Sequence, residues 1–183
     1  MIGILAFQGA FFEHKKILDK LNLNSIIVKN VKDLEKVNSL IIPGGESSTM
    51  KKFINEEMKK ELFKFINIDK KLTIGTCAGI IILANYIKNE SKIIGGLDIE
   101  ICRNYYGSQN DSFIKKTYNV KTSDKRDQIY IRAPKIINVG KNVEVLHKYD
   151  DIITGVKSNN IIGVTFHPEI INDLNFYKNI FIK

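Results

Sequence analysis

The sequence has few cysteines and no long apolar runs. Only Cys77 and Cys102 occur among its 183 residues, which excludes a fold held together by disulfides and fits the reducing cytosol. The opening residues, MIGILAFQGA, lack the basic segment of a secretory signal, and no apolar run is long enough to span a membrane. We therefore expect a cytoplasmic protein with no membrane contact.

Motifs for bound nucleotides and metals are missing as well. Neither GxGxxG nor GxxxxGK[ST] occurs in the chain, and no cluster of metal ligands stands out. The absence of these motifs argues against a dinucleotide site or a P-loop. We expect a protein that needs no cofactor and no metal ion.

Arginine is rare, although the chain is basic. The formal net charge of +8 is compatible with nucleic-acid binding, but the lysines are scattered singly and in pairs. This pattern is typical of a solvated surface, so we expect no nucleic-acid partner. Arginine occurs only as Arg103, Arg126 and Arg132, which predicts that these positions need the planar guanidinium group.

The first half of the chain alternates between strand and helix patterns. A continuous apolar run at 2–7 predicts a strand buried on both faces, and helical spacing follows as far as Asn22. The further expected strands are 25–28, 40–42 and 72–76, and the expected helical segments are 31–37 and 48–66. Ser47 or Ser48 is the expected N-cap of the last segment. This order predicts a parallel sheet.

The pattern changes after the glycine pair at 95–96. Short β-like runs with polar turns continue to about Ala133, which favours an antiparallel extension over another strand–helix unit. Three closing strands are expected at 143–147, 152–156 and 161–166, before a last helix at 173–182. We therefore predict one α/β domain, built as a doubly wound three-layer α/β/α sandwich with a mostly parallel sheet and an antiparallel edge.

The stretch 71–86, KLTIGTCAGIIILANY, places a reactive side chain between a strand and a helix. Cys77 stands among small residues in the sequence GTCAG, which is the pattern of a nucleophile elbow with its tight, strained turn. A helix that begins there favours the thiolate over the thiol. Taken alone, the stretch is explained equally well by a buried structural cysteine.

An imidazole and a carboxylate follow near the end of the chain, in the sequence FHPE. If strand geometry continues past Phe166, His167 and Glu169 point to the same side of the strand. A carboxylate beside an imidazole fixes its tautomer and stabilises its charged form. With Cys77 they make a nucleophile, a base and an orienting group, at the carboxyl ends of strands of one sheet.

The loop 43–45, Pro-Gly-Gly, also follows the carboxyl end of an expected strand. Its glycines expose backbone N–H groups, which suits an oxyanion hole made by Gly44, Gly45 and Ala78. A phosphate cradle and a plain glycine turn remain as alternatives.

These motifs, in this order and at these spacings, resemble those of the class I glutamine amidotransferases. The chain is similar to the branch of glutaminase subunits of pyridoxal 5′-phosphate synthases, and the resemblance covers nearly its whole length. The supporting segments are ILAFQG with EH within 4–14, PGGES at 43–47, GTCAG at 75–79, RN at 103–104, DSF at 111–113, IRAP at 131–134 and FHPE at 166–169. The resemblance implies a flavodoxin-like fold and a single glutaminase domain spanning 1–183.

The resemblance also implies an activity. Cys77, His167 and Glu169 would form a Cys-His-Glu triad that hydrolyses L-glutamine to L-glutamate and ammonia. The ammonia would pass to a barrel-shaped synthase subunit, within a large hetero-oligomer that makes pyridoxal 5′-phosphate, or vitamin B6. The implied substrate-binding residues are Gly45, Glu46, Ser47, Arg103, Ile131 and Arg132.

Three other functions remain open at this point. They are a glutaminase that serves another pathway, a non-catalytic binding module on the same fold, and a cysteine hydrolase or chaperone without glutamine specificity. The intact set of Cys77, His167 and Glu169 argues against the binding module. Arg103 and Arg132 argue against the unspecific hydrolase.

The remaining histidines and the second cysteine have less definite roles. His14 is expected on the helix surface near a partner interface, with structural and functional roles equally open. His147 is expected to be structural or on the surface. Cys102 is expected to be a small free thiol without a role.

Overall fold

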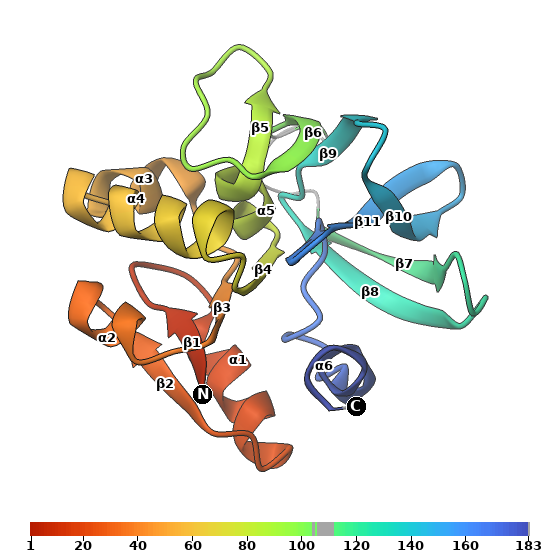
Figure 1. Ribbon diagram of the computed structural model, residues 1–183. Helices are drawn as coiled ribbons and strands as arrows, with labels where there is room; N and C mark the ends of the chain where they lie inside the picture. Colours follow the sequence, from red (N-terminus) through yellow and green to blue (C-terminus); the bar gives the residue numbers. More distant parts are fainter. Residues whose placement is uncertain (104, 106–111, 183) are drawn as a thin grey trace.

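The computed structural model describes residues 1–103, 105 and 112–182. Two positions of the family pattern, Asn104 and Asp111, lie outside these described residues. The main sheet has nine strands: β1 (Ile2–Leu5), β2 (Ser25–Val28), β3 (Ser39–Ile42), β4 (Leu72–Thr76), β7 (Ser112–Asn119), β8 (Lys125–Ile131), β10 (Glu144–Tyr149), β11 (Ile152–Ser158) and β12 (Ile161–Val164). Their order across the sheet is β2-β1-β3-β4-β12-β11-β10-β7-β8 (Figure 1).

This sheet has two halves that meet at β12. In the parallel half, strands β2, β1, β3, β4 and β12 run in the same direction. In the antiparallel half, each of β11, β10, β7 and β8 runs against its neighbour. The expected parallel sheet with an antiparallel extension is confirmed, and the extension contributes as many strand pairs as the parallel half.

Helices cover both faces of the sheet. Their bounds are α1 (Phe11–Lys20), α2 (Val31–Glu35), α3 (Ser47–Phe53), α4 (Glu56–Phe63), α5 (Ala78–Leu83) and α6 (Leu174–Phe181). Along β1, Ile4 belongs to the core under α1 and α6, and Leu5 to the core under α2 to α5, because successive side chains point to opposite faces. The result is the three-layer sandwich predicted from the sequence (Figure 1).

A small second sheet lies beyond α5. It consists of β5 (Ala84–Ile87), β6 (Leu97–Cys102) and β9 (Lys135–Val139). The helix expected to run on to Tyr86 ends at Leu83, and the chain continues as β5 alongside β6. Tyr86 and Ile87 favour a strand, so the pairing with β6 decides the conformation of this segment.

The helical region expected at 48–66 is two helices and a π-helical turn (Lys64–Ile68). The break falls at Asn55, whose side chain accepts a 2.8 Å hydrogen bond from the Met58 N–H and caps α4. The expected serine cap of α3 was wrong. Glu46 occupies the N-cap position without a capping bond, because its carboxylate accepts hydrogen bonds from the Ser48 and Thr49 hydroxyls.

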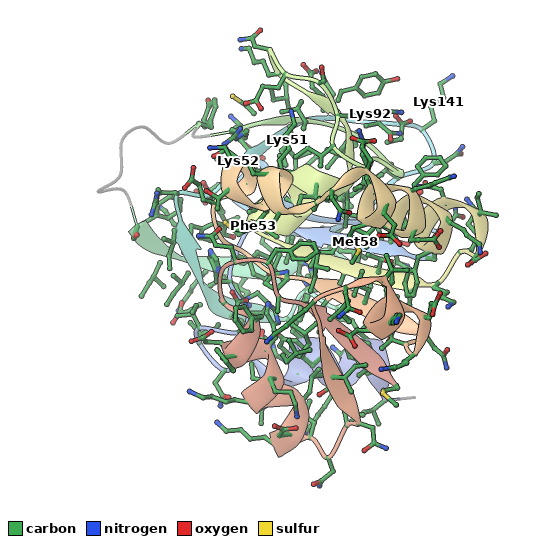
Figure 2. All side chains as sticks on the ribbon, turned by 90° about the vertical axis from the view of Figure 1, so that its left-hand side faces the viewer. Lys51, Lys52, Phe53, Met58, Lys92 and Lys141 are labelled. Carbon is green, nitrogen blue, oxygen red and sulfur yellow. The ribbon has the colours of Figure 1, made fainter. Side chains whose placement is uncertain are left out.

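Lysines point outward from separate elements. Figure 2 shows Lys51 and Lys52 on α3, Lys92 after β5 and Lys141 before β10, and all four side chains are exposed. Such a spread agrees with a solvated basic surface. In the part of the chain that the structure describes, no helix is long and apolar enough to cross a bilayer.

Candidate active site

Cys77 occupies a strained turn between β4 and α5. Its φ of +48° lies in a region that residues with a side chain rarely adopt. Gly79 lets the turn close, since a Cβ atom there would lie 2.0 Å from the carbonyl oxygen of Ile42. Only a glycine fits this approach, and the nucleophile elbow predicted from GTCAG is the turn that the structure contains.

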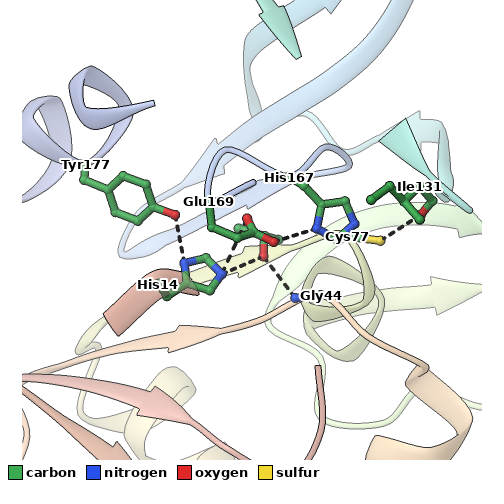
Figure 3. Close-up of polar contacts among 8 residues, drawn as sticks. His14, Gly44, Cys77, Ile131, His167, Glu169 and Tyr177 are labelled. Carbon is green, nitrogen blue, oxygen red and sulfur yellow. Dashed lines mark hydrogen bonds and ion pairs between the residues drawn. The ribbon is translucent and has the colours of Figure 1, made fainter. Parts of the chain in front are cut away.

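His167 and Glu169 meet through a turn and not along a strand. We expected strand geometry to continue past Phe166, but β12 ends at Val164, and the chain turns at 168–170. Their side chains nevertheless converge, with Nδ1 of His167 donating to Oε1 of Glu169 over 2.6 Å (Figure 3). The His167 backbone N–H donates to the Ile129 carbonyl on β8 over 3.0 Å and fixes the segment against the sheet.

The charge state of His167 is set by its two neighbours. Burial alone would lower the pKa of His167, but the Cys77 sulfur and the Glu169 carboxylate outweigh it and raise this pKa to about 10. Burial would raise the pKa of Glu169, yet the pKa is lowered by His14 and by the hydrogen bond from His167. The geometry therefore favours an imidazolium beside a carboxylate.

Gly44 brings the glycine loop against both reactive side chains. A Cβ atom on Gly44 would lie 2.4 Å from Cε1 of His167 and 3.1 Å from Cβ of Cys77, so only a glycine can stand there. The Cys77 thiol is directed to the Ile131 carbonyl, with 3.6 Å between sulfur and oxygen. Nε2 of His167 has no hydrogen-bond partner among the described residues, which leaves it available to a reacting group.

A pocket of about 200 Å³ opens over Cys77. It is lined by Gln8, Gly45, Glu46, Ser47, Cys77, Ala78, Ile81, Arg103, Ile131, Arg132 and His167. The lining includes every substrate-binding residue that the sequence predicted, and these residues come from three separate parts of the chain. Gln8 and Ile81 were not among the predicted substrate residues. Glu169 is buried behind His167, 4% exposed.

The two arginines of the pocket are placed differently. Arg103 follows β6, and its Nη1 donates to both carboxylate oxygens of Glu90, at 2.8 and 2.9 Å. Arg132 follows β8 with a φ of +45° and is exposed. The hydroxyls of Ser48 and Thr49, followed by both arginines, lower the pKa of Glu46. The pocket rim thus carries a carboxylate and two guanidinium groups around a small cavity.

The amides of the glycine loop are partly engaged. The Gly44 N–H donates to Thr76 Oγ1 over 3.1 Å, and the Gly44 carbonyl accepts from the Ala10 N–H over 3.2 Å. No described residue accepts a hydrogen bond from the Gly45 N–H. The Ala78 N–H lies in the first turn of α5, where the helix supplies no partner.

Sequence reasoning missed a second buried histidine beside the site. His14 was expected on the helix surface, but it is 0% exposed. Its ring lies between Tyr177 of α6, Thr76 of β4 and Glu169 (Figure 3). A signal was present in the sequence, because His14, Ile17 and Leu18 share one face of a helix by their spacing.

Neither Cys102 nor a cluster of metal ligands contributes to the site among the described residues. Cys102 is a free thiol whose sulfur lies 3.5 Å from the Arg103 carbonyl oxygen. Within the ranges described, no group of histidine, cysteine and acidic residues is arranged to hold a metal ion.

A cysteine elbow, a paired histidine and glutamate, and a glycine loop on this sheet are the features expected of a class I glutamine amidotransferase. The overall fold agrees with this class. A solved structure described as a glutamine amidotransferase matches with a TM-score of 0.90 and 33% identity, over 97% of this chain and 95% of that one. A more distant structure, PurLQS from Thermotoga maritima, has a TM-score of 0.68 at 18% identity and shares the fold.

Family membership follows from the sequence comparison. The model of the SNO glutamine amidotransferase family matches residues 4–183, and the chain belongs to that family. It is 42% identical, over its full length and 96% of the relative, to the pyridoxal 5′-phosphate synthase subunit PdxT of Caldicellulosiruptor saccharolyticus. It is 43% identical to the subunit of the same name from Thermotoga maritima, over 97% of this chain and 95% of the relative.

Proposed function

We propose that this chain is the glutaminase subunit of a pyridoxal 5′-phosphate synthase, which hydrolyses L-glutamine and supplies ammonia to a synthase subunit. The observation that carries this function is the convergence of Cys77, His167 and two arginines on one small pocket. The relatives named as pyridoxal 5′-phosphate synthase subunits support the pathway.

The first half of the reaction forms a thioester. The Cys77 thiolate attacks the side-chain amide carbon of glutamine, and the carbonyl oxygen becomes an oxyanion. The N–H groups of Ala78 and Gly45 are the proposed donors to this oxyanion, with the Gly44 amide held on Thr76. Protonated His167 gives its proton to the leaving nitrogen, the carbon–nitrogen bond breaks, and ammonia departs.

The second half of the reaction releases glutamate. Neutral His167 takes a proton from a water molecule, which attacks the thioester carbon. The carbon–sulfur bond breaks, and Cys77 leaves as a thiolate beside the newly formed imidazolium. Glu169 holds the ring through Nδ1 throughout, at 2.6 Å, so that Nε2 faces the reacting atoms in both halves.

Charge on the pocket rim suits the amino-acid end of glutamine. We assign the α-carboxylate of the substrate to Arg103 and Arg132, and its α-ammonium group to Glu46, with Ser47, Gly45 and the Ile131 backbone completing the site. Arg103 is oriented for this role by its pair with Glu90.

A partner is needed because the pocket over Cys77, at about 200 Å³, has room for little more than one glutamine. Ammonia released into bulk water is mostly protonated and loses its nucleophilicity, so hydrolysis has to be coupled to a docked acceptor. We propose a barrel-shaped synthase subunit as that acceptor, in a large hetero-oligomer. The proposed contacts are Gln8, Gly9 and the start of α1, where Phe12 is 60% exposed.

Docking can act on the site through the glycine loop. Gln8 accepts a 2.7 Å hydrogen bond from the Glu46 N–H, and the Ala10 N–H holds the Gly44 carbonyl. A partner that moves residues 8–10 therefore changes the orientation of the Gly44–Gly45 peptide, which glycines permit at little cost.

Glutamate release by the purified chain, with and without the synthase subunit, tests this function. We expect the isolated chain to be a poor glutaminase and the complex to be markedly faster. Equal rates with a complex shown to form would refute the switch. Equal rates without a complex would point to a glutaminase that serves another pathway, and no glutamate release in either case would refute the activity.

A further inference from the structure

A chain of buried polar groups lies behind the triad. Nδ1 of His14 is 2.8 Å from the Tyr177 hydroxyl, and Nε2 is 3.3 Å from Thr76 Oγ1 and 3.6 Å from Oε2 of Glu169. Thr76 Oγ1 in turn accepts the Gly44 N–H over 3.1 Å. Figure 3 shows that His14 occupies the branch point between the carboxylate and the glycine loop.

Hydrogen-bonding capacity settles which nitrogen of His14 carries the proton. Oε2 of Glu169 is buried, accepts only, and has no hydrogen bond among the described residues, so the nitrogen that faces it should be the donor. With the proton on Nε2, Nδ1 accepts from the Tyr177 hydroxyl. Burial raises the pKa of Tyr177 well above its usual value, so this hydroxyl keeps its proton.

His14 itself stays neutral in this arrangement. Burial lowers the pKa of His14, against the opposing effect of Glu169, while His167 lowers it further and Glu13 raises it slightly. A neutral His14 ring interacts with Glu169 through its N–H dipole and does not cancel the negative charge of the carboxylate. The full charge of the carboxylate therefore remains available to His167.

We propose that His14 is a positioning residue for the glutaminase reaction, whose Nε2–H faces both the free oxygen of Glu169 and Thr76 Oγ1, the atom that also accepts the Gly44 N–H. Tyr177 selects the tautomer that can do this. The inference rests on the proposed function, and it adds a second histidine that acts through Glu169 and the glycine loop without touching the substrate.

One substitution pair separates positioning from packing. His14→Leu removes both ring nitrogens and keeps an apolar side chain, whereas His14→Gln retains an N–H at about the reach of Nε2. With saturating synthase subunit, we expect His14→Leu to lower kcat about tenfold or more with KM within about twofold, since His14 is not part of the pocket. His14→Gln should recover most of this loss.

A second measurement needs neither glutamine nor the partner. The rate of Cys77 alkylation by iodoacetamide, followed against pH in a Cys102→Ala background, reports how well His167 stabilises the thiolate. We expect His14→Leu to shift this profile to higher pH and to slow alkylation several-fold near pH 7. If the chain releases no glutamate at all, the proposed function fails while this profile still tests His14.

Tyr177→Phe tests the same contact if His14→Leu fails to fold, because it removes one hydroxyl and keeps the ring. Alone, it should lower kcat about two- to fivefold. In the His14→Leu background it should have no further effect, since the two residues act through one path.

A purely structural His14 gives different results. Rates corrected for the folded fraction and the alkylation profile would then equal those of the parent protein, even if the melting temperature falls. That outcome would overturn the proposal, and so would additive effects of Tyr177→Phe and His14→Leu.

Discussion

Each half of the main sheet carries a histidine with a shifted pKa, and the two pKa values shift in opposite directions. His167 follows β12 at the edge of the parallel half, and its neighbours Cys77 and Glu169 overcome burial and raise its pKa to about 10. His147 on β10 is partly buried, and burial lowers its pKa to about 4, because the opposing effect of the Asp173 carboxylate does not offset it and Arg126 lowers the pKa further. Burial alone therefore does not predict a functional histidine, because the neighbouring charges decide its state.

The two pockets also differ in their charged groups and not in their size. The pocket of the antiparallel half, beside His147, measures about 210 Å³, against about 200 Å³ over Cys77. Its buried carboxylate is paired within the protein, since Asp173 accepts from Arg126 at 3.1 Å, from Gln128 at 2.9 Å and from the Phe176 N–H at 3.1 Å. Size does not distinguish the pockets, whereas the presence of a nucleophile beside a polarised base does.

Removing the nucleophile should give the largest effect. We expect Cys77→Ala to lower glutamate release on the order of 10⁴-fold or more, as in other acyl-transfer sites that lose their nucleophile. The matched control is Cys102→Ala, which should keep most of the activity because Cys102 faces the Arg103 carbonyl. Substantial turnover by Cys77→Ala would remove the reason for treating the parallel half as the active half.

Neutralising the orienting carboxylate should have the next largest effect. Glu169→Gln keeps the size of the side chain but removes the charge that holds His167 protonated, so we expect kcat to fall on the order of 10²-fold. Steady-state kinetics and circular dichroism together check that activity falls while the fold persists. Unchanged turnover would mean that Glu169 only shapes the turn after β12.

The antiparallel half should show its histidine through acid sensitivity. The unfolded chain binds a proton on His147 near pH 6.5 and the folded chain only near pH 4, so the free energy of unfolding falls as the pH drops between these values. We expect this residue to account for about 2 kcal/mol between pH 7 and pH 4.5. Urea unfolding of His147→Gln and of the parent protein at both pH values measures the difference, which should be absent if His147 is solvated.

Exchange of the rim arginines should have the smallest effect. Arg103→Lys or Arg132→Lys keeps the charge and loses the planar fork, and we expect the KM for glutamine to rise about tenfold with a smaller change in kcat. Arg126→Lys, in the other pocket, is the matched control and should leave KM unchanged. Normal glutamine binding by both rim variants would contradict the assignment of the α-carboxylate.

Local patterns predicted the parts of the site that are built from neighbouring residues. The sequence GTCAG identified the elbow because glycine is required where Gly79 approaches the Ile42 carbonyl. The strands at 25–28 and 72–76 have the predicted bounds, since short runs rich in β-branched residues favour strands. The contact of His167 with Glu169 was predicted for the wrong reason, because a turn and not a strand brings them together.

Contacts between segments that are far apart in the sequence could not be predicted from local patterns. The strand at Ala84–Ile87 forms because β6 pairs with it, and the sequence at 84–87 alone does not show that the helix ends at Leu83. The position of Tyr177 beside His14 depends on how α6 packs against α1. The flanking charges of His14 suggested a surface position, although its helical spacing with Ile17 and Leu18 indicated burial.

The central position of β12 has a consequence for the order of folding. It is the final strand in the chain, yet it pairs with β4 on one side, Ile162 against Ile74, and with β11 on the other. The chain between β4 and β12 is long, and closing it costs entropy before the strand contacts can offset that cost. The insertion of β12 is therefore expected late. Cys77 consequently meets His167 only when the sheet is complete, and the chain gains its reactive thiol as one of the last events of folding.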